Sequence, residues 1–215
     1  MKRIKIGVLV SGWGSNLQAI IDNIEKGALS VDLAVVISDQ ADAYALERAN
    51  KHNIPAVSIG PKKNTPREEY DAVVVAELRA RQVDLVCMAG FMRIITPVLL
   101  QAYPDRVMNI HPSLLPTFPG LRVQKKALDH GVKFSGCTVH FVDEGMDTGP
   151  IIIQAVVPVL DSDTEDVLAE RILKQEHTIF SRAIQLFAEG RVTVKDGRVF
   201  VQGHEGRNND VLINP

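Results

Sequence analysis

Short apolar runs alternate with longer amphipathic segments through the first half of the chain. Residues 4 to 10, 33 to 38 and 83 to 88 are mostly apolar and β-branched, which is typical of parallel strands buried on both faces. Segments with apolar residues at helical spacing separate these runs. The alternation predicts an α/β fold with a right-handed, doubly wound, mostly parallel sheet.

Helix-end signals bound the intervening segments. The first, SNLQAIIDNIEKG, ends at Gly27, and the second, ADAYALERANKHNIP, ends at Pro55. The third runs from Thr65 to Arg81, with Thr65 as the N-cap and Pro66 at the first helical position. Each of these helices is expected to pack its apolar stripe on the sheet.

The second half of the chain changes character. Two strand-like runs, GCTVHFV and PIIIQAVVPV, are joined by DEGMDTG. A long helix follows from Thr164 to Ala188, opened by a capping box with Asp163 or Thr164 at its cap. RVTVKDGRVFVQG then predicts a terminal hairpin with Asp196 and Gly197 in a two-residue turn.

Composition and charge exclude several classes of protein. Lys and Arg number 24 against 26 Asp and Glu, without the single-signed blocks that suit nucleic acid or an anionic membrane. The longest apolar runs, of about seven residues, fall far short of the roughly 20 that a membrane span needs. Cys87 and Cys137 lie among apolar residues, which favours buried thiols in a reducing cytoplasm.

The stretch NIHPSLLPTFPG, residues 109 to 120, carries the strongest chemical signal. Asn109 and His111 stand two apart, and we expect them to lie in a loop whose three prolines restrict its backbone. An amide donor beside an imidazole suits a carbonyl oxygen on which negative charge builds. Taken alone, the segment also fits a rigid turn whose Asn and His cap neighbouring backbone, and the Leu115-Pro116 bond is a candidate for the cis form.

A second chemical signal is the loop SGWGSNL, residues 11 to 17. Its glycines allow a tight turn, and the amides of Ser15 and Asn16 begin a helix whose N-terminus attracts anions, so the loop predicts a phosphate site. Two alternatives stay open. Asp39 stands where a nicotinamide site would need a ribose-binding acid, although Leu17 replaces that site's third glycine, and a plain glycine turn is also consistent.

Two further loops complete the set of candidates. AGFMRIITP, residues 89 to 97, follows a buried strand where open α/β sheets bind ligands, so its apolar side chains either hold a flat heteroaromatic ring or pack in the core. In residues 136 to 150, Asp147 could accept a hydrogen bond from His111 and support its charged form. A metal site of His111, His140 and Asp147 is an alternative without a closely spaced ligand pair, and His140 alone fits a buried core histidine.

These loops, in this order, resemble those of the phosphoribosylglycinamide formyltransferases, a branch of the folate-dependent formyltransferase superfamily. The likeness runs from GSNLQAIID through ADAYALERA, AGFMRI, NIHPSLLP and HFVDEGMDTGPIIIQ to KQEH. NIHPSLLP with the D-x-G-P element points to the superfamily, and GSNL points to this branch. The resemblance implies transfer of a formyl group from 10-formyltetrahydrofolate, a co-substrate, to the amine of glycinamide ribonucleotide in purine biosynthesis, with no metal.

The resemblance also implies roles for the matching positions. The catalytic residues would be Asn109, His111 and Asp147. The ribonucleotide would contact Gly14, Ser15, Asn16 and Glu176, and the folate would contact Arg67, Met92, Arg93, Ile94, Ile95, Asp143 and Glu144. Trp13 stands where the family also has small or polar residues, which should change the surface of the loop rather than its backbone amides.

The expected organisation is one catalytic domain over residues 1–203. Residues 1–100 would form its phosphate-binding half, residues 101–203 its folate and catalytic half, and residues 204–215 a polar tail. We expect a cytoplasmic monomer or homodimer that binds small-molecule substrates, not nucleic acid or membranes.

Four other functions are alternatives to this expectation. A 10-formyltetrahydrofolate hydrolase would use the same trio without needing a phosphate loop, and a methionyl-tRNA formyltransferase would be expected to carry a further C-terminal domain. A nicotinamide oxidoreductase is weakened by Leu17. A non-catalytic nucleotide-binding module is weakened by the joint presence of Asn109, His111 and Asp147.

Overall fold

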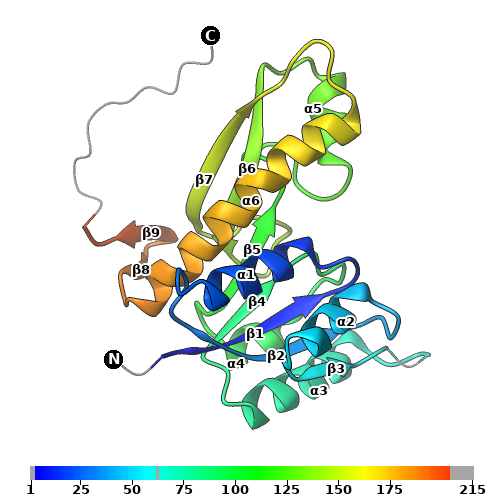
Figure 1. Ribbon diagram of the computed structural model, residues 1–215, viewed down its shortest axis with the longest axis vertical. Helices are drawn as coiled ribbons and strands as arrows, with labels where there is room; N and C mark the ends of the chain where they lie inside the picture. The colour runs from blue at the N-terminus through cyan, green and yellow to red at the C-terminus, as the bar shows by residue number, and fades with distance from the viewer. Residues whose placement is uncertain (1–2, 62, 204–215) are drawn as a thin grey trace.

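The structure, a computed structural model, describes residues 3–61 and 63–203, so the polar tail predicted at residues 204–215 lies outside the described residues. Its main sheet has seven strands in the order β3-β2-β1-β4-β5-β6-β7 (Figure 1). Neighbouring strands are parallel from β3 to β5, β6 is antiparallel to β5, and β7 is antiparallel to β6. The predicted mostly parallel, doubly wound sheet is therefore confirmed. The strands are β1 (Lys5–Val10), β2 (Asp32–Ser38), β3 (Ala56–Ser58), β4 (Leu85–Met88), β5 (Val107–His111), β6 (Phe134–Phe141) and β7 (Ile151–Pro158).

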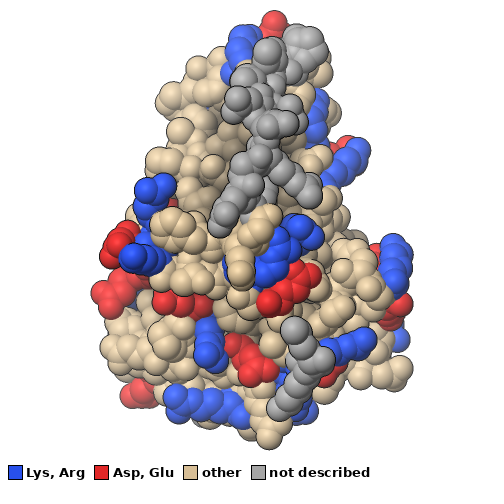
Figure 2. Space-filling view, turned by 90° about the vertical axis from the view of Figure 1, so that its left-hand side faces the viewer, with Lys and Arg blue, Asp and Glu red and all other residues tan. Residues whose placement is uncertain are grey.

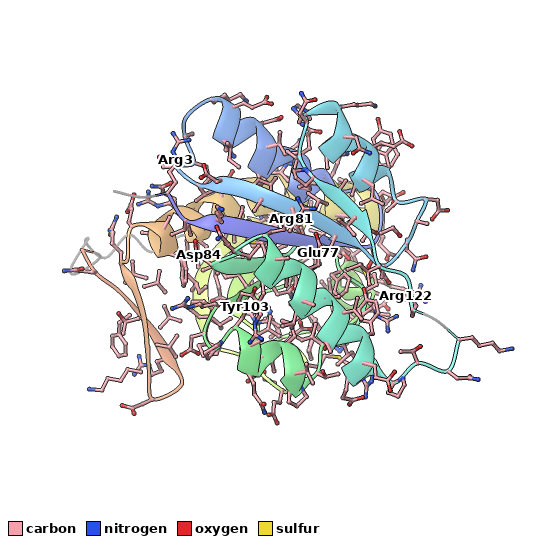
Figure 3. The ribbon with its side chains drawn as sticks, turned by 90° about the horizontal axis from the view of Figure 1, so that it is seen from below. Arg3, Glu77, Arg81, Asp84, Tyr103 and Arg122 are labelled. Carbon is pink, nitrogen blue, oxygen red and sulfur yellow. The ribbon has the colours of Figure 1, made fainter. Side chains whose placement is uncertain are left out.

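Helices cover both faces of this sheet (Figures 1 and 3). One face packs against α1 (Ser15–Glu25), α2 (Tyr44–Lys51) and the long α6 (Glu165–Ala188), which also contacts α5 (Val123–Asp129). The other face packs against α3 (Arg67–Ala80) and α4 (Pro97–Ala102). Each face has its own apolar cluster, so strands β1, β2, β4 and β5 are buried on both sides, as the apolar runs predict.

The strand order brings the chemistry-bearing loops together. Strands β1, β4 and β5 are parallel neighbours, so the loops that leave their carboxyl ends meet at one edge of the sheet. The backbone N–H of Ser11 donates to the Gly90 carbonyl at 3.0 Å, and the Ser11 hydroxyl accepts from the Met92 N–H at 2.8 Å. These bonds tie the loop after β1 to the loop after β4.

One sequence prediction about the proline-rich segment is wrong. Asn109 and His111 do not lie in a loop, because they end strand β5, and the three prolines follow the strand. The apolar residues Val107, Met108 and Ile110 are buried, which anchors the strand in the sheet. The Leu115-Pro116 bond is cis, as the sequence suggested.

Two helix starts differ in detail from the prediction. The third helix begins at Arg67 with Pro66 as its N-cap and no side-chain cap, so the prediction of Thr65 as the cap is wrong by one residue. The long helix does begin after Thr164, whose hydroxyl accepts from the Val167 N–H at 3.3 Å. Val167 occupies the third helical position and has no side-chain acceptor, so only half of the capping box forms.

The predicted terminal hairpin of the second half is also confirmed. Strands β8 (Val192–Lys195) and β9 (Arg198–Val201) form the terminal hairpin, with Asp196 and Gly197 at positive φ in its turn. Both cysteines are free and buried. Figure 2 shows acidic and basic side chains interspersed on one face of the molecule. Among the described residues, no helix combines the length and the apolar character needed to span a bilayer.

Candidate active site

Most of the predicted site residues line adjoining cavities at the carboxyl edge of β1, β4 and β5. The largest of them, about 500 Å³, is lined at one end by Asn16 and Glu176 and elsewhere by Asn109, His111 and Asp147. A neighbouring cavity of about 250 Å³ shares Arg93, Asn109 and Asp147 with it and adds Ile95, His140, Asp143 and Glu144. The cavity geometry therefore joins the proposed catalytic residues to both sets of predicted ligand contacts.

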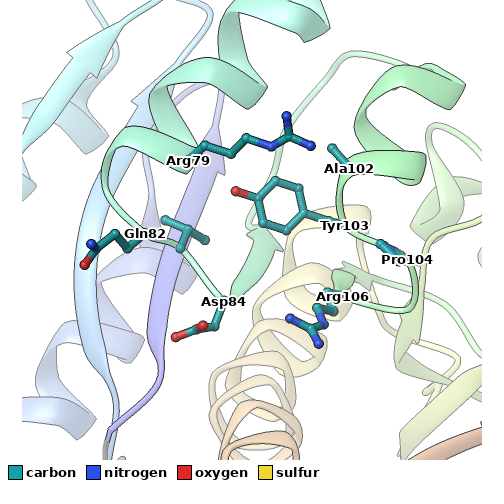
Figure 4. A pocket seen from close by; sticks show the side chains of 8 residues that line it. Arg79, Gln82, Asp84, Ala102, Tyr103, Pro104 and Arg106 are labelled. Carbon is teal, nitrogen blue, oxygen red and sulfur yellow. The ribbon is translucent and has the colours of Figure 1, made fainter.

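A separate hollow of about 310 Å³ lies where β4 and β5 begin, between the ends of α3 and α4 (Figures 3 and 4). It is lined by Arg79, Tyr103 and Arg106, and Figure 4 shows the Tyr103 ring beneath the Arg79 side chain. It contains none of the residues that the sequence singled out. The adjoining cavities at the opposite edge of the sheet are therefore the candidate active site.

Asn109, His111 and Asp147 lie together, as predicted. Asn109 and His111 are two apart on β5, so their side chains leave the same face of the strand. The Asp147 Oδ2 atom lies 3.5 Å from His111 Nδ1, and it accepts a 2.8 Å hydrogen bond from the Gly120 N–H. The His111 and Asp147 side chains are only 7% and 14% exposed. A charge on either one is therefore weakly screened by solvent.

The surroundings of His111 fix which nitrogen carries its first proton. His111 Nε2 lies 3.0 Å from the Phe118 carbonyl, which can only accept, so Nε2 is protonated. Nδ1 is then the nitrogen without a hydrogen in the neutral ring. It faces Asp147 in the cavity, 3.5 Å from Asp147 Oδ2.

His140 orients Asn109, a role that sequence reasoning missed by favouring a core histidine. His140 pairs with Asn109 across β5 and β6, and its Nδ1 lies 2.8 Å from the Phe141 carbonyl, so Nδ1 is protonated. Burial lowers the pKa of His140, which keeps the ring neutral near pH 7. Its Nε2 therefore accepts from Asn109 Nδ2 at 3.2 Å, leaving the second amide proton of Asn109 free.

The lowered pKa of His140 predicts a pH-dependent contribution to stability. In the unfolded chain His140 binds protons more readily than in the folded protein, so the wild type should lose stability as the pH falls below about 6.5 towards the lower folded pKa. His140→Gln removes this titration but not that of other groups. Urea unfolding should show the wild type's advantage over His140→Gln shrinking between about pH 8 and about pH 5.5. A constant or growing advantage would contradict the neutral His140.

The predicted phosphate loop, residues 11–17, opens onto a hollow of about 270 Å³. Gly14 takes a left-handed conformation, with φ of 73°, immediately before α1. The described residues provide no hydrogen-bond partner for the backbone N–H groups of Trp13, Gly14, Ser15 and Asn16. Free N–H groups at a helix N-terminus are the usual protein site for a phosphate.

Glu176 reaches this loop from α6, although 160 residues separate it from Asn16. The Asn16 amide donates to Glu176 Oε2 at 2.7 Å, and Glu176 is only 7% exposed. Burial raises the pKa of the Glu176 carboxyl, and the hydrogen bond from Asn16 opposes that shift. Glu176 thus links the phosphate loop to the cavity that holds the trio.

The predicted folate contacts fall into two groups, those that line the cavities and Arg67, which does not. Met92, Arg93 and Ile94 line the largest cavity, and the Arg93 guanidinium lies over the Tyr70 ring at 4.3 Å. Met92 is 70% exposed, so it presents apolar surface to the opening rather than filling the core. Arg67, the first residue of α3, is exposed and lines neither cavity.

The alternative of a metal site finds no support in this geometry. No group of three or more His, Cys, Asp and Glu side chains in residues 3–61 and 63–203 is arranged to hold a metal ion. The close contacts of His140 and His111 are with backbone carbonyls and with Asn109 and Asp147. Hydrogen bonds and charge interactions therefore account for the positions of His111 and His140.

Comparison with known proteins gives consistent matches. A family model described as formyl transferase matches residues 4–184. The phosphoribosylglycinamide formyltransferase of Escherichia coli (strain K12) is 41% identical over 200 residues, covering 93% of this chain and 94% of that protein. The trifunctional purine biosynthetic protein adenosine-3 of Drosophila melanogaster is 48% identical over 195 residues, or 90% of this chain. This chain spans only 14% of the length of that larger protein.

A solved structure matches at the level of the fold as well as the sequence. The crystal structure of glycinamide ribonucleotide transformylase 1 from Symbiobacterium toebii superposes with a TM-score of 0.91 at 53% sequence identity. The match covers 93% of this chain and 94% of that chain. The sheet, the long helix and the terminal hairpin thus belong to a known architecture.

Proposed function

The chain belongs to the formyl transferase family, and we propose that it transfers a formyl group from 10-formyltetrahydrofolate to the amine of N1-(5-phospho-D-ribosyl)glycinamide. It is then a phosphoribosylglycinamide formyltransferase of de novo purine biosynthesis. The observation that carries this proposal is the cavity that joins Asn16 and Glu176 to Asn109, His111 and Asp147. A phosphate held at one end of a substrate would leave its amine near the trio at the other.

The proposed reaction is an acyl transfer in which atoms and charges balance. The ribonucleotide amine attacks the formyl carbon, and the carbonyl electron pair moves onto oxygen as the new carbon–nitrogen bond forms. The pair then returns, the bond from the formyl carbon to N10 of the folate breaks, and its electrons remain on N10. The attacking nitrogen loses one proton and N10 gains one.

Asn109, His111 and Asp147 stabilise the oxyanion and assist transfer of the proton that the amine releases. One amide N–H of Asn109 already donates to His140 Nε2. Asn109 therefore offers its second amide proton to the oxygen. His111, protonated at Nδ1, offers a second and charged donor, and Asp147 stabilises the imidazolium at 3.5 Å. Asp147 also helps water to carry away the proton that the amine releases.

The two substrates bind on opposite sides of the trio. The N–H groups of Gly14, Ser15 and Asn16 hold the phosphate, and Glu176 contacts the ribonucleotide beyond it. Met92, Arg93, Ile94 and Ile95, with the backbone at Asp143 and Glu144, hold the flat ring of the folate. Arg67 would contact the folate only where that substrate extends beyond the cavities.

We also propose that the reaction needs no metal and that small molecules are the only substrates. Residues 1–203 act as one catalytic domain in the cytoplasm, with phosphate binding in residues 1–100 and catalysis in residues 101–203. The active species is a monomer or a homodimer.

An optical assay tests the proposed function. The protein is mixed with 10-formyltetrahydrofolate, with and without the ribonucleotide, and the conversion to tetrahydrofolate is followed by absorbance. We expect loss of the formyl group only when the ribonucleotide is present. Equal loss without the ribonucleotide would identify a hydrolase, and no loss in either mixture would exclude both functions.

Substitution of Gly14 should separate the two substrate sites. A Cβ at Gly14 would lie 2.7 Å from the Ala45 Cβ, so Gly14→Ala must displace the phosphate loop. We expect the Michaelis constant for the ribonucleotide to rise about tenfold or more, because loop amides that stabilise a phosphate are misaligned, with little change for the folate.

Gly27→Ala is the matched control for this measurement. Gly27 has nearly the same φ, 72° against 73°, but a Cβ added there would have no neighbour within 4 Å. It should share the backbone strain of Gly14→Ala and leave both Michaelis constants unchanged. Equal increases for both substrates in Gly14→Ala would indicate general misfolding and remove the phosphate assignment.

A further inference from the structure

Helix α2 donates hydrogen bonds to two successive carbonyl groups of the phosphate loop. The Ala45 N–H donates to the Gly12 carbonyl at 3.1 Å, and the Arg48 Nε–H donates to the Trp13 carbonyl at 2.9 Å. A second guanidinium nitrogen of Arg48 donates to the Gln18 side chain at 3.0 Å. Arg48 therefore bridges the loop and the first turn of α1.

These two carbonyl contacts decide where the loop N–H groups point. In a planar trans peptide the carbonyl and the following N–H point in opposite directions. Because the Gly12 and Trp13 carbonyls turn towards α2, the N–H groups of Trp13 and Gly14 turn away from it. Both residues line the hollow at the start of α1, where their N–H groups find no partner among the described residues.

Aromatic stacking holds the Arg48 side chain in this position. The rings of Trp13 and Tyr44 stack with their centroids 4.5 Å apart and their planes 19° apart. The Arg48 guanidinium carbon lies 4.7 Å from the Tyr44 centroid and 5.3 Å from the Trp13 centroid. Such contacts favour a planar guanidinium over an ammonium. Trp13, the departure from the family pattern, therefore takes part in the contact that holds its own carbonyl.

The charge of Arg48 is not cancelled by a carboxylate. Both of its hydrogen-bond acceptors are neutral, and no ion pair involves Arg48 within residues 3–61 and 63–203. An uncompensated cation beside the loop adds a positive potential to that of the helix N-terminus.

We propose that Arg48 is a positioning residue for the ribonucleotide phosphate, which it serves by holding the Trp13 carbonyl and so aiming the loop N–H groups. The inference rests on the proposed function for the identity of the substrate, but not for the anion site itself. Arg48 acts through the loop and does not touch the reacting atoms.

The chain carries its own probe for this inference. Trp13 is the only tryptophan among the 215 residues, so intrinsic fluorescence reports on the phosphate loop. We would titrate the full chain with inorganic phosphate and fit the dissociation constant from Trp13 emission. Arg48→Met keeps an apolar side chain of similar length but removes both hydrogen bonds and the charge.

Lys51→Met is the matched control, because it removes a cation from the same helix and the same Tyr44 ring. The Lys51 ammonium lies 5.0 Å from the Tyr44 centroid and donates to the Tyr44 hydroxyl at 3.3 Å, without a bond to the loop. We expect the dissociation constant for phosphate to rise about tenfold in Arg48→Met and to change less than about twofold in Lys51→Met.

Kinetics should show the same separation. In Arg48→Met the Michaelis constant for the ribonucleotide should rise by a similar factor, while the turnover number and the Michaelis constant for the folate stay within about twofold. Arg48→Lys retains the charge but not the planar fork, so it should lie between the wild type and Arg48→Met. It also provides the test if Arg48→Met does not fold.

Three results would overturn the inference. They are unchanged phosphate binding in Arg48→Met, an equal loss in Lys51→Met, and wild-type binding in Arg48→Lys, since charge alone would then explain the effect. Failure of the proposed function is recognised separately. In that case the wild type shows no formyl transfer to the ribonucleotide, whatever the phosphate titrations give.

Discussion

Asn109→Ala and His111→Ala should each lower the turnover number for formyl transfer by about 10² to 10³-fold, the usual cost of losing one oxyanion donor. Both side chains leave the same face of β5 and line the same cavity, so they can donate to one oxygen. Residues that stabilise one charge together do not act independently. The double variant should therefore lose less activity than the product of the two single losses.

Folate binding provides the control for this cycle. The oxyanion forms only during the reaction, so both single variants should bind the folate almost as tightly as the wild type. Stopped-flow or steady-state rates with equilibrium binding of a folate analogue would measure both quantities. A structural role would be indicated if the double variant lost activity by the product of the two single losses and a single variant no longer bound the folate.

Asp147→Asn should lower the turnover number by at least about tenfold, and by up to about 10³-fold if the proton relay is also lost. The carboxylate lies 3.5 Å from His111 Nδ1 in a poorly solvated site, where in the proposed mechanism it stabilises an imidazolium that donates to the oxyanion. The substitution is chosen because Asp147 has φ of 57°, a left-handed conformation that asparagine also adopts readily.

The Michaelis constants distinguish this effect from damage to the loop. Asp147 also accepts from the Gly120 N–H at 2.8 Å, and the amide oxygen of asparagine can preserve that bond. Both Michaelis constants should therefore change little while the turnover number falls. A variant with wild-type turnover would show that the charge of Asp147 does not support catalysis.

The first half of the fold could be predicted because its strands are buried on both faces. Strands β1, β2 and β4 form continuous apolar runs, and the helices between them carry clear end signals. Strand β3 has only three residues, too few for a periodic pattern. Strand β5 was missed because Asn109 and His111 give it a polar face, and the prolines after it favour a turn.

The parts of the candidate site formed by residues close in sequence could be predicted. The parts that depend on strand register or on long-range contacts could not. Asn109 and His111 stand two apart, so one segment reveals them. His140 meets Asn109 only through the register of β5 with β6, which no local pattern specifies. Glu176 was named from the family resemblance, because its contact with Asn16 spans 160 residues. The Thr65 cap was misplaced because helix ends depend on a few competing hydrogen bonds.

The central claim is that the cavity brings a ribonucleotide amine to a formyl carbon. The most direct test uses 10-formyltetrahydrofolate labelled with carbon-13 in the formyl group, with the ribonucleotide present and the products followed by NMR and mass spectrometry. We predict that the label appears as a formamide carbon attached to the ribonucleotide amine, at a rate that Asn109→Ala and His111→Ala suppress. Label recovered only as free formate, or retained on the folate, would contradict the proposed transfer.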